Sequence, residues 1–437
     1  MYICGLRNLG VDMKILFATM QFGPEYNQGT ERYIRNVGKE LIEDGYEVTV
    51  AGGDPEGKGH REGIWNSIPY KTIPTYGWTT VSGASIDWYV ELLRKEKPDI
   101  LHMVNPGHIG VNIIFAARAL HIPYLVSVTD FWWLCPKQTL TLSNGSLCDG
   151  FTSESTCLKC IAKTHRNPTI NLAAKTKIGA QFTAQIIKSK NIESDESTLW
   201  KNRRQILQEA LSGAHKVICL SKTGKVLLEN YFNLKNCQYL PAGLSARWFE
   251  QKTSSSVSTN KFSVGFLGAI TPHKGLHVLT QALKALDNER IQLIIAGKRA
   301  LPTYADRELQ RYKKTTYLGE IKEEDTTPLM DKLDLIVLPS LWPENQPQVL
   351  LEAGARRVPV IASDIPGCAE LLDQSALFPM GSQKALSNLI KKITNNEIII
   401  PKPNVSKSAK EIAKKIILEY KSIIEKNKLT ARPQTRK

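Results

Sequence analysis

The sequence predicts an α/β protein built from two doubly wound domains with parallel sheets. Short apolar strand patterns alternate with helical patterns along the chain, and this alternation favours parallel strands connected by helices. The chain has 437 residues, which is too long for a single hydrophobic core, so two cores are expected. Small and polar residues fill the segment 251–260, as in a linker between domains. An apolar content of 42% and a charged content of 23% are ordinary for a globular protein.

The first half opens with a strand, a glycine-bearing loop, a helix and a second strand. The strand patterns cover 14–19 and 47–51, and the helix follows the loop 23–30 and ends near Asp44. Gly29 stands where this helix begins. Glycine there lets a ligand approach the backbone, and a helix N-terminus favours an anion. A plain tight turn is the alternative explanation of Gly29.

Two later strands of the first half place polar side chains at their carboxyl ends. The strand 98–104 carries His102 and is followed by His108, and the strand 123–128 is followed by Asp130. Ligands of open α/β sheets bind at the carboxyl ends of strands, so these three side chains are candidates for contact with a substrate. A satisfied core position is the alternative for His102.

The second half contains the most informative pair of residues, Glu344 and Glu352. A strand pattern over 335–338 runs into Pro339 and the next helix starts near Gln348, so one carboxylate should lie on a loop and the other in the first turn of the helix. Carboxylates accept hydrogen bonds in pairs, which suits the vicinal hydroxyls of a sugar or ribose. The helix start also offers free backbone N–H groups to a phosphate.

The surroundings of this pair resemble a known family. The run 339–370, with Pro359-Val-Ile-Ala-Ser-Asp364 and Gly367, is similar to the nucleotide-sugar site of the retaining glycosyltransferases of family 4. The resemblance extends over most of the chain and is strongest in the C-terminal half. It implies the GT-B fold, with two Rossmann-like domains facing across a cleft, an acceptor-binding first domain and a donor-binding second domain.

The resemblance and the composition together give the expected domain organisation. We expect a helix near the C-terminus to pack back on the first domain, as it does in this fold. The expected segments are an N-terminal extension over 1–12, an N-terminal domain over 13–245 with a cysteine-containing basic insertion at about 135–212, a linker over 246–261, a C-terminal domain over 262–405, the helix over 406–427 and a basic tail over 428–437.

The resemblance also implies roles for individual residues. Glu352 would bind the ribose hydroxyls, Glu344 the transferred sugar, and Lys274 the diphosphate, where charge develops as the glycosidic bond breaks. The donor-binding set is Gly29, Gly268, Lys274, Glu344, Asn345, Gln346 and Glu352. The catalytic set is Asp130, Glu344 and Lys274. The acceptor or sugar side would hold His102, His108 and Asp130.

Three positions depart from the pattern of the family. Thr129 stands where many relatives carry a histidine, Ala269 where relatives often have an arginine, and Arg357 where glycine is common. Lys298 or Arg299 would compensate for the missing arginine. Two alternatives to a transferase stay open. One is a sugar-nucleotide epimerase, a class of enzyme that also uses the GT-B fold. The other, motivated by the three departures, is a catalytically degenerate subunit that binds a nucleotide sugar without turnover.

The function implied is transfer of a sugar, with retention of anomeric configuration, from a nucleoside-diphosphate sugar to a saccharide or lipid-linked saccharide acceptor in cell-surface polysaccharide biosynthesis. The resemblance implies that fixed positive charge and helix N-termini stabilise the leaving group, so no cofactor is expected for catalysis. The absence of an Asp-x-Asp metal motif near the site agrees with this expectation. The sequence has no run of eighteen apolar residues and no signal-peptide pattern, so a cytoplasmic protein is expected.

Four of the eight cysteines cluster in the first half, and two of them have Cys-x2-Cys spacing. That spacing lets two thiolates share a tetrahedral Zn²⁺, and a cytosolic chain should not keep disulfides. A structural zinc site, reduced unligated thiols and a disulfide remain three alternatives for Cys135, Cys148, Cys157 and Cys160.

The net charge of +15 is concentrated in two segments. Residues 161–204 contain nine Lys and Arg against three Asp and Glu, and residues 401–437 contain eleven against three. Docking on an anionic membrane surface, on the inner face of the cell membrane, is one explanation. A solvated helix face with a frayed terminus is the other. Nucleic acid is not an expected partner, because the basic residues are not interleaved with stacking aromatics.

Overall fold

A computed structural model of the chain describes residues 13–430 except 56, 58–60, 78–79, 151–152, 164–171, 173–175, 177–201, 252–260 and 405. The chain divides into two compact units. The first holds the residues up to Gly243 together with those from Ala409 onward, and the second holds Leu244–Ser408. The predictions made for the extension 1–12, for most of the basic segment 161–204 and for the tail beyond 430 lie outside the described residues.

The described part of the first unit contains one eight-stranded sheet in the order β3-β4-β2-β1-β5-β6-β7-β8. Its neighbours pair in parallel except β3, which is antiparallel to β4. The central strands β5 and β6 are buried at every residue, as expected for parallel strands covered on both faces. The strands are β1 (Lys14–Thr19), β2 (Glu47–Gly53), β3 (Glu62–Trp65), β4 (Ile68–Ile73), β5 (Ile100–Asn105), β6 (Tyr124–Val128), β7 (Lys216–Cys219) and β8 (Cys237–Tyr239).

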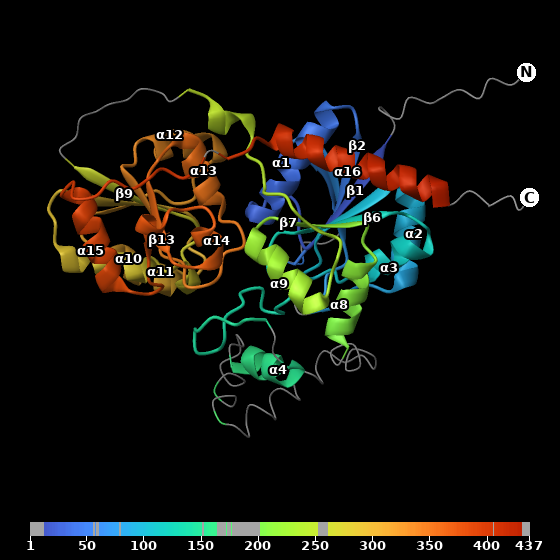
Figure 1. Cartoon of the computed structure of the whole chain (residues 1–437), viewed down its shortest axis with the longest axis horizontal. Coiled ribbons are helices and arrows are strands. Elements are labelled where there is room, and N and C mark those ends of the chain that lie inside the picture. Colours follow the sequence, from blue (N-terminus) through green and yellow to red (C-terminus); the bar gives the residue numbers. More distant parts are fainter. Residues whose placement is uncertain are drawn as a thin grey trace, which may run out of the picture. The chain divides into compact units, whose positions relative to one another are not determined.

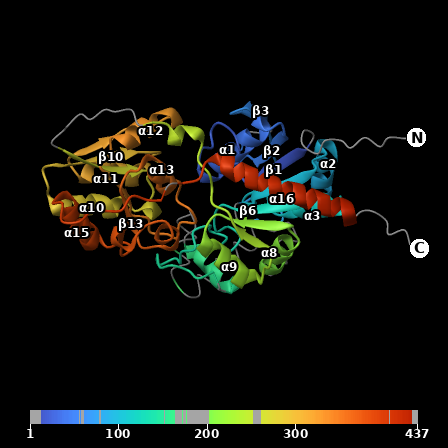
Figure 2. The same cartoon turned by 45° about the horizontal axis from the view of Figure 1, so that its top comes forward.

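The last helix of the chain packs on the first unit, beside its first helix (Figures 1 and 2). Its buried side chains repeat at helical spacing, so one apolar face is covered. The large side chains on this face include Ile412, Ile416, Tyr420 and Ile423. The helices of this unit are α1 (Gly29–Glu43), α2 (Ile86–Glu96), α3 (Asn112–Ala119), α4 (Glu154–Lys163), α8 (Arg203–Ser212), α9 (Lys222–Phe232) and α16 (Ala409–Thr430).

The second unit contains a six-stranded, fully parallel sheet in the order β11-β10-β9-β12-β13-β14 within the described residues. Its strands are β9 (Phe262–Leu267), β10 (Ile291–Ala296), β11 (Thr315–Tyr317), β12 (Leu335–Leu338), β13 (Val360–Ser363) and β14 (Leu377–Phe378). Its helices are α10 (Leu276–Leu286), α11 (Pro302–Arg311), α12 (Glu323–Asp331), α13 (Gln348–Arg356), α14 (Pro366–Ala369) and α15 (Gln383–Thr394), with short 3-10 helices η1 (Ala246–Phe249), η2 (Pro272–Lys274) and η3 (Gln374–Ala376). Two α/β units with predominantly parallel sheets confirm the predicted fold class.

The order of strands reverses beside β9, because β10 lies on one side of it and β12 on the other. Such a switch point leaves a crevice outside the carboxyl ends of the two strands, where ligands of open α/β sheets bind. The first sheet has the equivalent point between β1 and β5. The predicted sites follow the strands at these two places.

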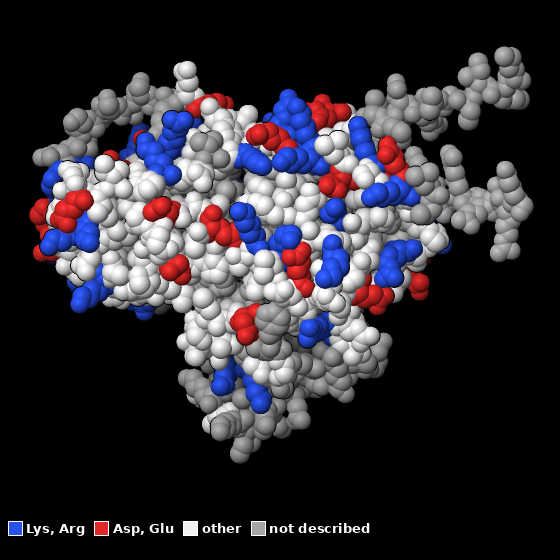
Figure 3. Space-filling view, in the orientation of Figure 1, with Lys and Arg blue, Asp and Glu red and all other residues white. Residues whose placement is uncertain are grey.

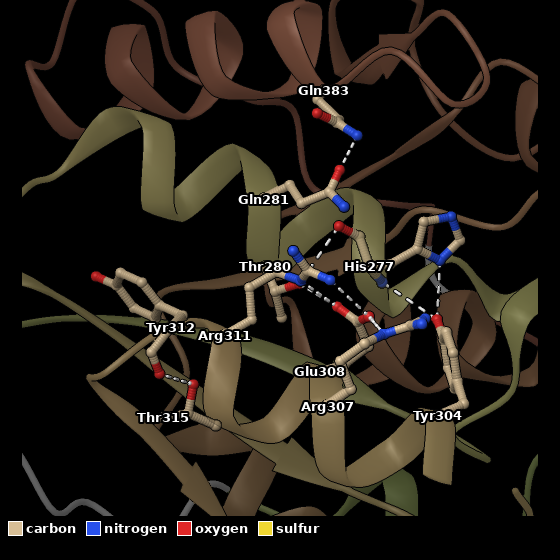
Figure 4. Close-up of polar contacts among 10 residues, drawn as sticks. All are labelled: His277, Thr280, Gln281, Tyr304, Arg307, Glu308, Arg311, Tyr312, Thr315 and Gln383. Atoms are coloured by element: carbon tan, nitrogen blue, oxygen red, sulfur yellow. Dashed lines mark hydrogen bonds and ion pairs between the residues drawn. The ribbon is translucent and has the colours of Figure 1, made fainter.

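A buried carboxylate fixes α10, the helix that follows the turn after β9. Glu308 of α11 is fully buried and accepts bonds from Thr280 of α10 (2.9 Å), Arg307 (2.8 Å) and Arg311 (2.7 Å), as Figure 4 shows. Burial alone would raise the pKa of Glu308, but the bonds from these partners outweigh it and lower the pKa below its ordinary value. The network therefore ties α10 to α11 with an ionised carboxylate.

Two features of the described residues concern a membrane, the distribution of surface charge and the character of the helices. On the face shown in Figure 3, the described Lys and Arg side chains are interspersed with Asp and Glu. Within the described residues, no helix has both the length and the apolar character needed to span a bilayer.

Candidate functional site

The predicted donor residues lie where two loops of the second unit meet, the turn after β9 and the loop after β12. Gly275 has φ of +74° and lies so close to Pro339 that a Cβ on it would be 1.8 Å from the Pro339 carbonyl oxygen. The Leu341 N–H donates to the His273 carbonyl at 2.8 Å, which joins the loops a second time. Only glycine allows both the left-handed conformation and this approach.

The structure brings Lys274 and Glu344 together, although 70 positions separate them in the sequence. The Lys274 ammonium lies 2.6 Å from Glu344 Oε1, and the same oxygen accepts bonds from Ser340 Oγ and Trp342 Nε1, both at 2.9 Å. The ammonium also lies 5.0 Å from the centroid of the Trp342 ring. The Glu344 side chain is only 9% exposed, so these donors compensate for the burial of its charge.

Ser340, Trp342 and His273 were not among the predicted site residues. The rings of His273 and Trp342 are in edge contact, with centroids 5.1 Å apart, and burial followed by the nearby Lys274 charge lowers the pKa of His273 to about 4. Each residue lies within four positions of a predicted one. A tryptophan two positions from a proposed sugar-binding glutamate was the signal available in the sequence.

The remaining donor residues lie on the same loops and on α13. Asn345 and Glu352 are buried and Gln346 is half-buried. The helix begins at Gln348 as predicted, but Glu352 is not in its first turn, because a turn takes only 3.6 residues. The prediction of a first-turn position for Glu352 is therefore wrong by about one residue. Gly367 packs on this loop, and a Cβ there would be 1.9 Å from the Glu344 carbonyl oxygen.

The turn after β9 also holds Ala269, one of the positions that depart from the pattern of the family. Gly268, at the end of β9, has φ of +142°. Two residues further on, the Ile270 N–H donates to the Lys298 carbonyl oxygen at 2.8 Å. The Lys298 backbone therefore lies beside the turn that holds Ala269, whereas the exposed Arg299 guanidinium is paired with Asp306.

Arg357 caps α13 in the left-handed conformation, with φ of +52°. Glycine adopts that conformation at the end of a helix without strain, which explains why relatives have glycine here.

The residues predicted for the acceptor side lie in the first unit, at the carboxyl ends of β1, β5 and β6. Gly29 begins α1, and Thr30 of that helix is hydrogen-bonded through its hydroxyl to the Thr129 hydroxyl at 2.9 Å. Thr129, where many relatives carry a histidine, therefore joins the start of α1 to the end of β6.

Asp130 is half-buried and held by two donors, Asn105 Nδ2 at 2.6 Å and the Trp132 N–H at 2.8 Å. Burial raises the pKa of Asp130 to about 6, against the lowering effect of these two bonds. Asn105 was not predicted as a site residue. Its place at the last position of β5, the strand that carries His102, was the available signal.

The two histidines of the predicted acceptor side lie in different environments. His102 is fully buried, with Nδ1 2.5 Å from Tyr420 Oη and Nε2 2.7 Å from Ser127 Oγ. The structure therefore places His102 in the core and not at the acceptor surface, because its position is in the middle of a buried strand. His108 follows the strand with φ of +62°, and its Nδ1 is 3.0 Å from the Tyr76 carbonyl oxygen.

The four clustered cysteines are half-buried, and none of them forms a disulfide with another described residue. Lys137 donates to the Cys160 sulfur at 3.4 Å, and the thiols of Cys135 and Cys157 lie near the buried guanidinium of Arg203. In the described ranges, however, no three Cys, His, Asp or Glu side chains are placed to hold a common metal ion. The arrangement thus does not form a metal site as it stands, and the zinc site stays a prediction.

Comparison with known proteins covers both units. A family described as "Glycosyltransferase Family 4" matches residues 27–144, and a family described as "Glycosyl transferases group 1" matches residues 249–416. The glycosyltransferase CapM of capsular polysaccharide biosynthesis in Staphylococcus aureus is 23% identical over 42% of this chain and 50% of its own length. TuaC of Bacillus subtilis, a putative teichuronic acid biosynthesis glycosyltransferase, is 28% identical over 31% of this chain and 34% of its own length.

Solved structures share the architecture of nearly the whole chain. HepE of Anabaena in complex with UDP has a TM-score of 0.60 and 16% identity and covers 95% of this chain and 100% of its own. Sucrose-phosphate synthase of Thermosynechococcus elongatus has a TM-score of 0.59 and 15% identity and covers 96% and 97%. At this identity the likeness concerns the fold alone.

The matched segments span about half or less of the length of the curated relatives. The two family matches nevertheless fall one in each unit, around the Thr30–Thr129 contact and around the Lys274–Glu344 pair. With the GT-B architecture found in both units, they show that the chain belongs to the family 4, or group 1, glycosyltransferases.

Proposed function

We propose that the chain is a retaining glycosyltransferase that moves a sugar from a nucleoside-diphosphate sugar to a saccharide or lipid-linked saccharide in cell-surface polysaccharide biosynthesis. The observation that carries this proposal is the Lys274–Glu344 ion pair at the switch point of the second sheet. A cation suited to a diphosphate and a carboxylate suited to sugar hydroxyls meet there within one unit. CapM and TuaC, named for capsular polysaccharide and teichuronic acid biosynthesis, support the acceptor class.

The first donor to test is a uridine-diphosphate sugar. HepE, which shares the fold, has been solved with UDP and with UDP-glucose. In this chain Glu352 on α13 would accept from the ribose hydroxyls, and Lys274 with the start of α10, two residues further on, would face the diphosphate.

The chemistry we propose breaks the bond between the sugar C1 and the diphosphate oxygen. The negative charge left on the nucleoside diphosphate would be stabilised by the Lys274 ammonium and by the helix N-terminus. An acceptor hydroxyl would attack C1 from the face that the leaving group departs from, which retains the anomeric configuration. Its proton would pass to a phosphate oxygen of the leaving group, so the step needs no further reactant.

The acceptor would be held by the first unit. Asp130, fixed by Asn105 and by the Trp132 N–H, is the best-placed carboxylate for an acceptor hydroxyl among the predicted residues. Since catalysis is proposed to use fixed protein charge, transfer should continue in the presence of a metal chelator. Loss of activity on chelation, with the thermal unfolding temperature of the protein unchanged, would contradict this part of the mechanism.

The experiment that tests the donor site is isothermal titration of UDP, GDP, ADP and their sugars into the protein and its Glu352→Ala variant. Glu324→Ala, which removes an exposed glutamate from α12 of the same unit, is the matched control. One nucleotide should bind to the wild type and the control and not to Glu352→Ala. No binding by the wild type to any nucleotide or sugar would reject the proposal.

Turnover separates the proposal from its two alternatives. Conversion of the donor alone, without any acceptor, would show an epimerase. Donor binding without transfer to any saccharide or lipid-linked acceptor would show a degenerate binding subunit.

The location and the structural metal are also proposals. We expect a cytoplasmic protein that docks peripherally on an anionic membrane, and sedimentation with phosphatidylserine vesicles at low and high salt tests this.

Metal analysis of the purified protein and of Cys157→Ser tests whether the cysteine cluster binds a structural zinc ion. About one zinc per chain in the wild type and none in the variant would support it.

A further inference from the structure

The two carboxylate oxygens of Glu344 have different surroundings. Oε1 accepts three bonds, from Lys274 Nζ at 2.6 Å, Ser340 Oγ at 2.9 Å and Trp342 Nε1 at 2.9 Å. Among the residues that the structure describes, no donor contacts Oε2. A carboxylate has about four acceptor positions, two on each oxygen, so Oε1 is saturated while Oε2 keeps its capacity to accept.

The three donors reach Oε1 from two loops. Ser340 and Trp342 belong to the loop after β12, and Lys274 belongs to the turn after β9. Donors that converge from separate segments fix the torsion angles of a side chain more firmly than one ion pair, which a flexible lysine can follow as it moves. The carboxylate of Glu344 is thus held with one oxygen committed to the protein.

Trp342 is the donor with aromatic ring contacts to two neighbouring side chains. Its side chain is half-buried, its ring is in edge contact with His273 at 5.1 Å between centroids, and its face lies 5.0 Å from the Lys274 ammonium. An indole has one N–H donor and no acceptor. In its bond to Glu344 Oε1 it can therefore act only as the donor, and it cannot exchange roles as the Ser340 hydroxyl can.

We infer that Trp342 is a positioning residue that sets the sugar specificity of the donor site, by holding Glu344 Oε1 so that Oε2 is left to accept from hydroxyls of the transferred sugar. The inference rests on the proposed function, because it requires a nucleotide sugar in this site. The ligand class is a hexosyl group with free hydroxyls. A donor that lacks the hydroxyl facing Oε2, or carries it in the inverted configuration, would leave that oxygen unpaired and would bind more weakly.

The test compares the affinity for a nucleoside diphosphate with that for its sugar, measured by isothermal titration with the nucleotide that the wild type binds. Trp342→Phe keeps an aromatic ring at this position and removes the indole N–H together with part of the ring system. Its affinity for the diphosphate should stay within about twofold of the wild type, while its affinity for the diphosphate sugar should fall about tenfold. Discrimination between the glucosyl donor and its galactosyl epimer should fall as well.

Two further variants keep the test decisive. Trp248→Phe makes the same substitution at a buried tryptophan of the second unit and should leave both affinities unchanged. Ser340→Ala removes a different donor from Oε1 and should weaken sugar binding in the same direction as Trp342→Phe, which covers the case in which the tryptophan variant fails to fold.

Two results would overturn the inference. An equal loss of affinity for the diphosphate and for its sugar in Trp342→Phe would show a packing role, and unchanged affinity for both would show that the indole N–H does not position Glu344. Failure of the wild type to bind any nucleotide sugar would instead remove the proposed function itself, so the two failures are distinguishable.

Discussion

The buried histidine of β5 makes a prediction about the pH dependence of stability. His102 lies in a chain of hydrogen bonds from Tyr420 of α16 through His102 and Ser127 to Tyr33 of α1, with all four side chains buried. Burial lowers the pKa of His102 from its ordinary 6.5 to about 3. The folded protein therefore keeps this ring neutral at pH values where the unfolded chain is protonated.

The difference between the His102 pKa values of the folded and unfolded states sets the sign and the size of the change in the free energy of unfolding with pH. Between pH 6.5 and about 3 the unfolded state binds one more proton than the folded state, so the contribution of His102 is fully present above pH 6.5 and is lost as the pH falls. Between pH 7 and pH 5 the loss is about 2 kcal/mol of the free energy of unfolding. At pH 5 this figure is insensitive to the folded pKa, as long as that pKa is below about 4.

Urea unfolding at pH 7 and pH 5, followed by tryptophan fluorescence, measures this loss in the wild type and in His102→Gln. Glutamine offers a donor and an acceptor but does not titrate. The variant should be less stable at pH 7, and its stability should fall by about 2 kcal/mol less than that of the wild type on going to pH 5. Other titrating groups cancel in the comparison. An equal fall in both proteins would refute the assignment of His102 as a neutral core residue.

Two other predictions concern the sites. Gly275→Ala should abolish donor binding and destabilise the second unit, because the new Cβ would be 1.8 Å from the Pro339 oxygen. Gly319→Ala is the control, since Gly319 has the same φ of +74° with nothing within 4 Å of the new Cβ, and it should cost only the strain of about 1–2 kcal/mol. Equal effects in thermal unfolding and nucleotide titration would contradict the role of the close approach. For the other site, the pKa of Asp130 near 6 predicts that transfer activity falls as the pH drops through about 6, where the carboxylate takes up a proton. Asp130→Asn should be less active at pH 7.5 and should lack that fall in its pH profile, and an acid limb retained in the variant would assign the titration to another group.

The alternation of strands and helices could be predicted from the sequence because each element depends mainly on neighbouring residues. The predicted strands 14–19 and 335–338 coincide with β1 and β12, and the helix predicted to start near Gln348 begins there. Apolar periodicity and glycine or proline at the ends determine such elements within a few neighbouring residues. The two candidate sites followed from the rule that ligands bind at the carboxyl ends of parallel strands.

The pattern of residues determined the family, the fold class and the strands on which the candidate sites lie. Only the tertiary structure decided which residues meet. It joined Lys274 to Glu344, added Ser340 and Trp342 to their contact, and placed His102 in the core between Tyr420 and Ser127. The reason is physical, because burial and hydrogen-bond partners depend on segments that are distant in sequence. The sequence pattern around a histidine in an apolar strand is the same whether its ring faces a ligand or, as here, a tyrosine 318 residues further along the chain.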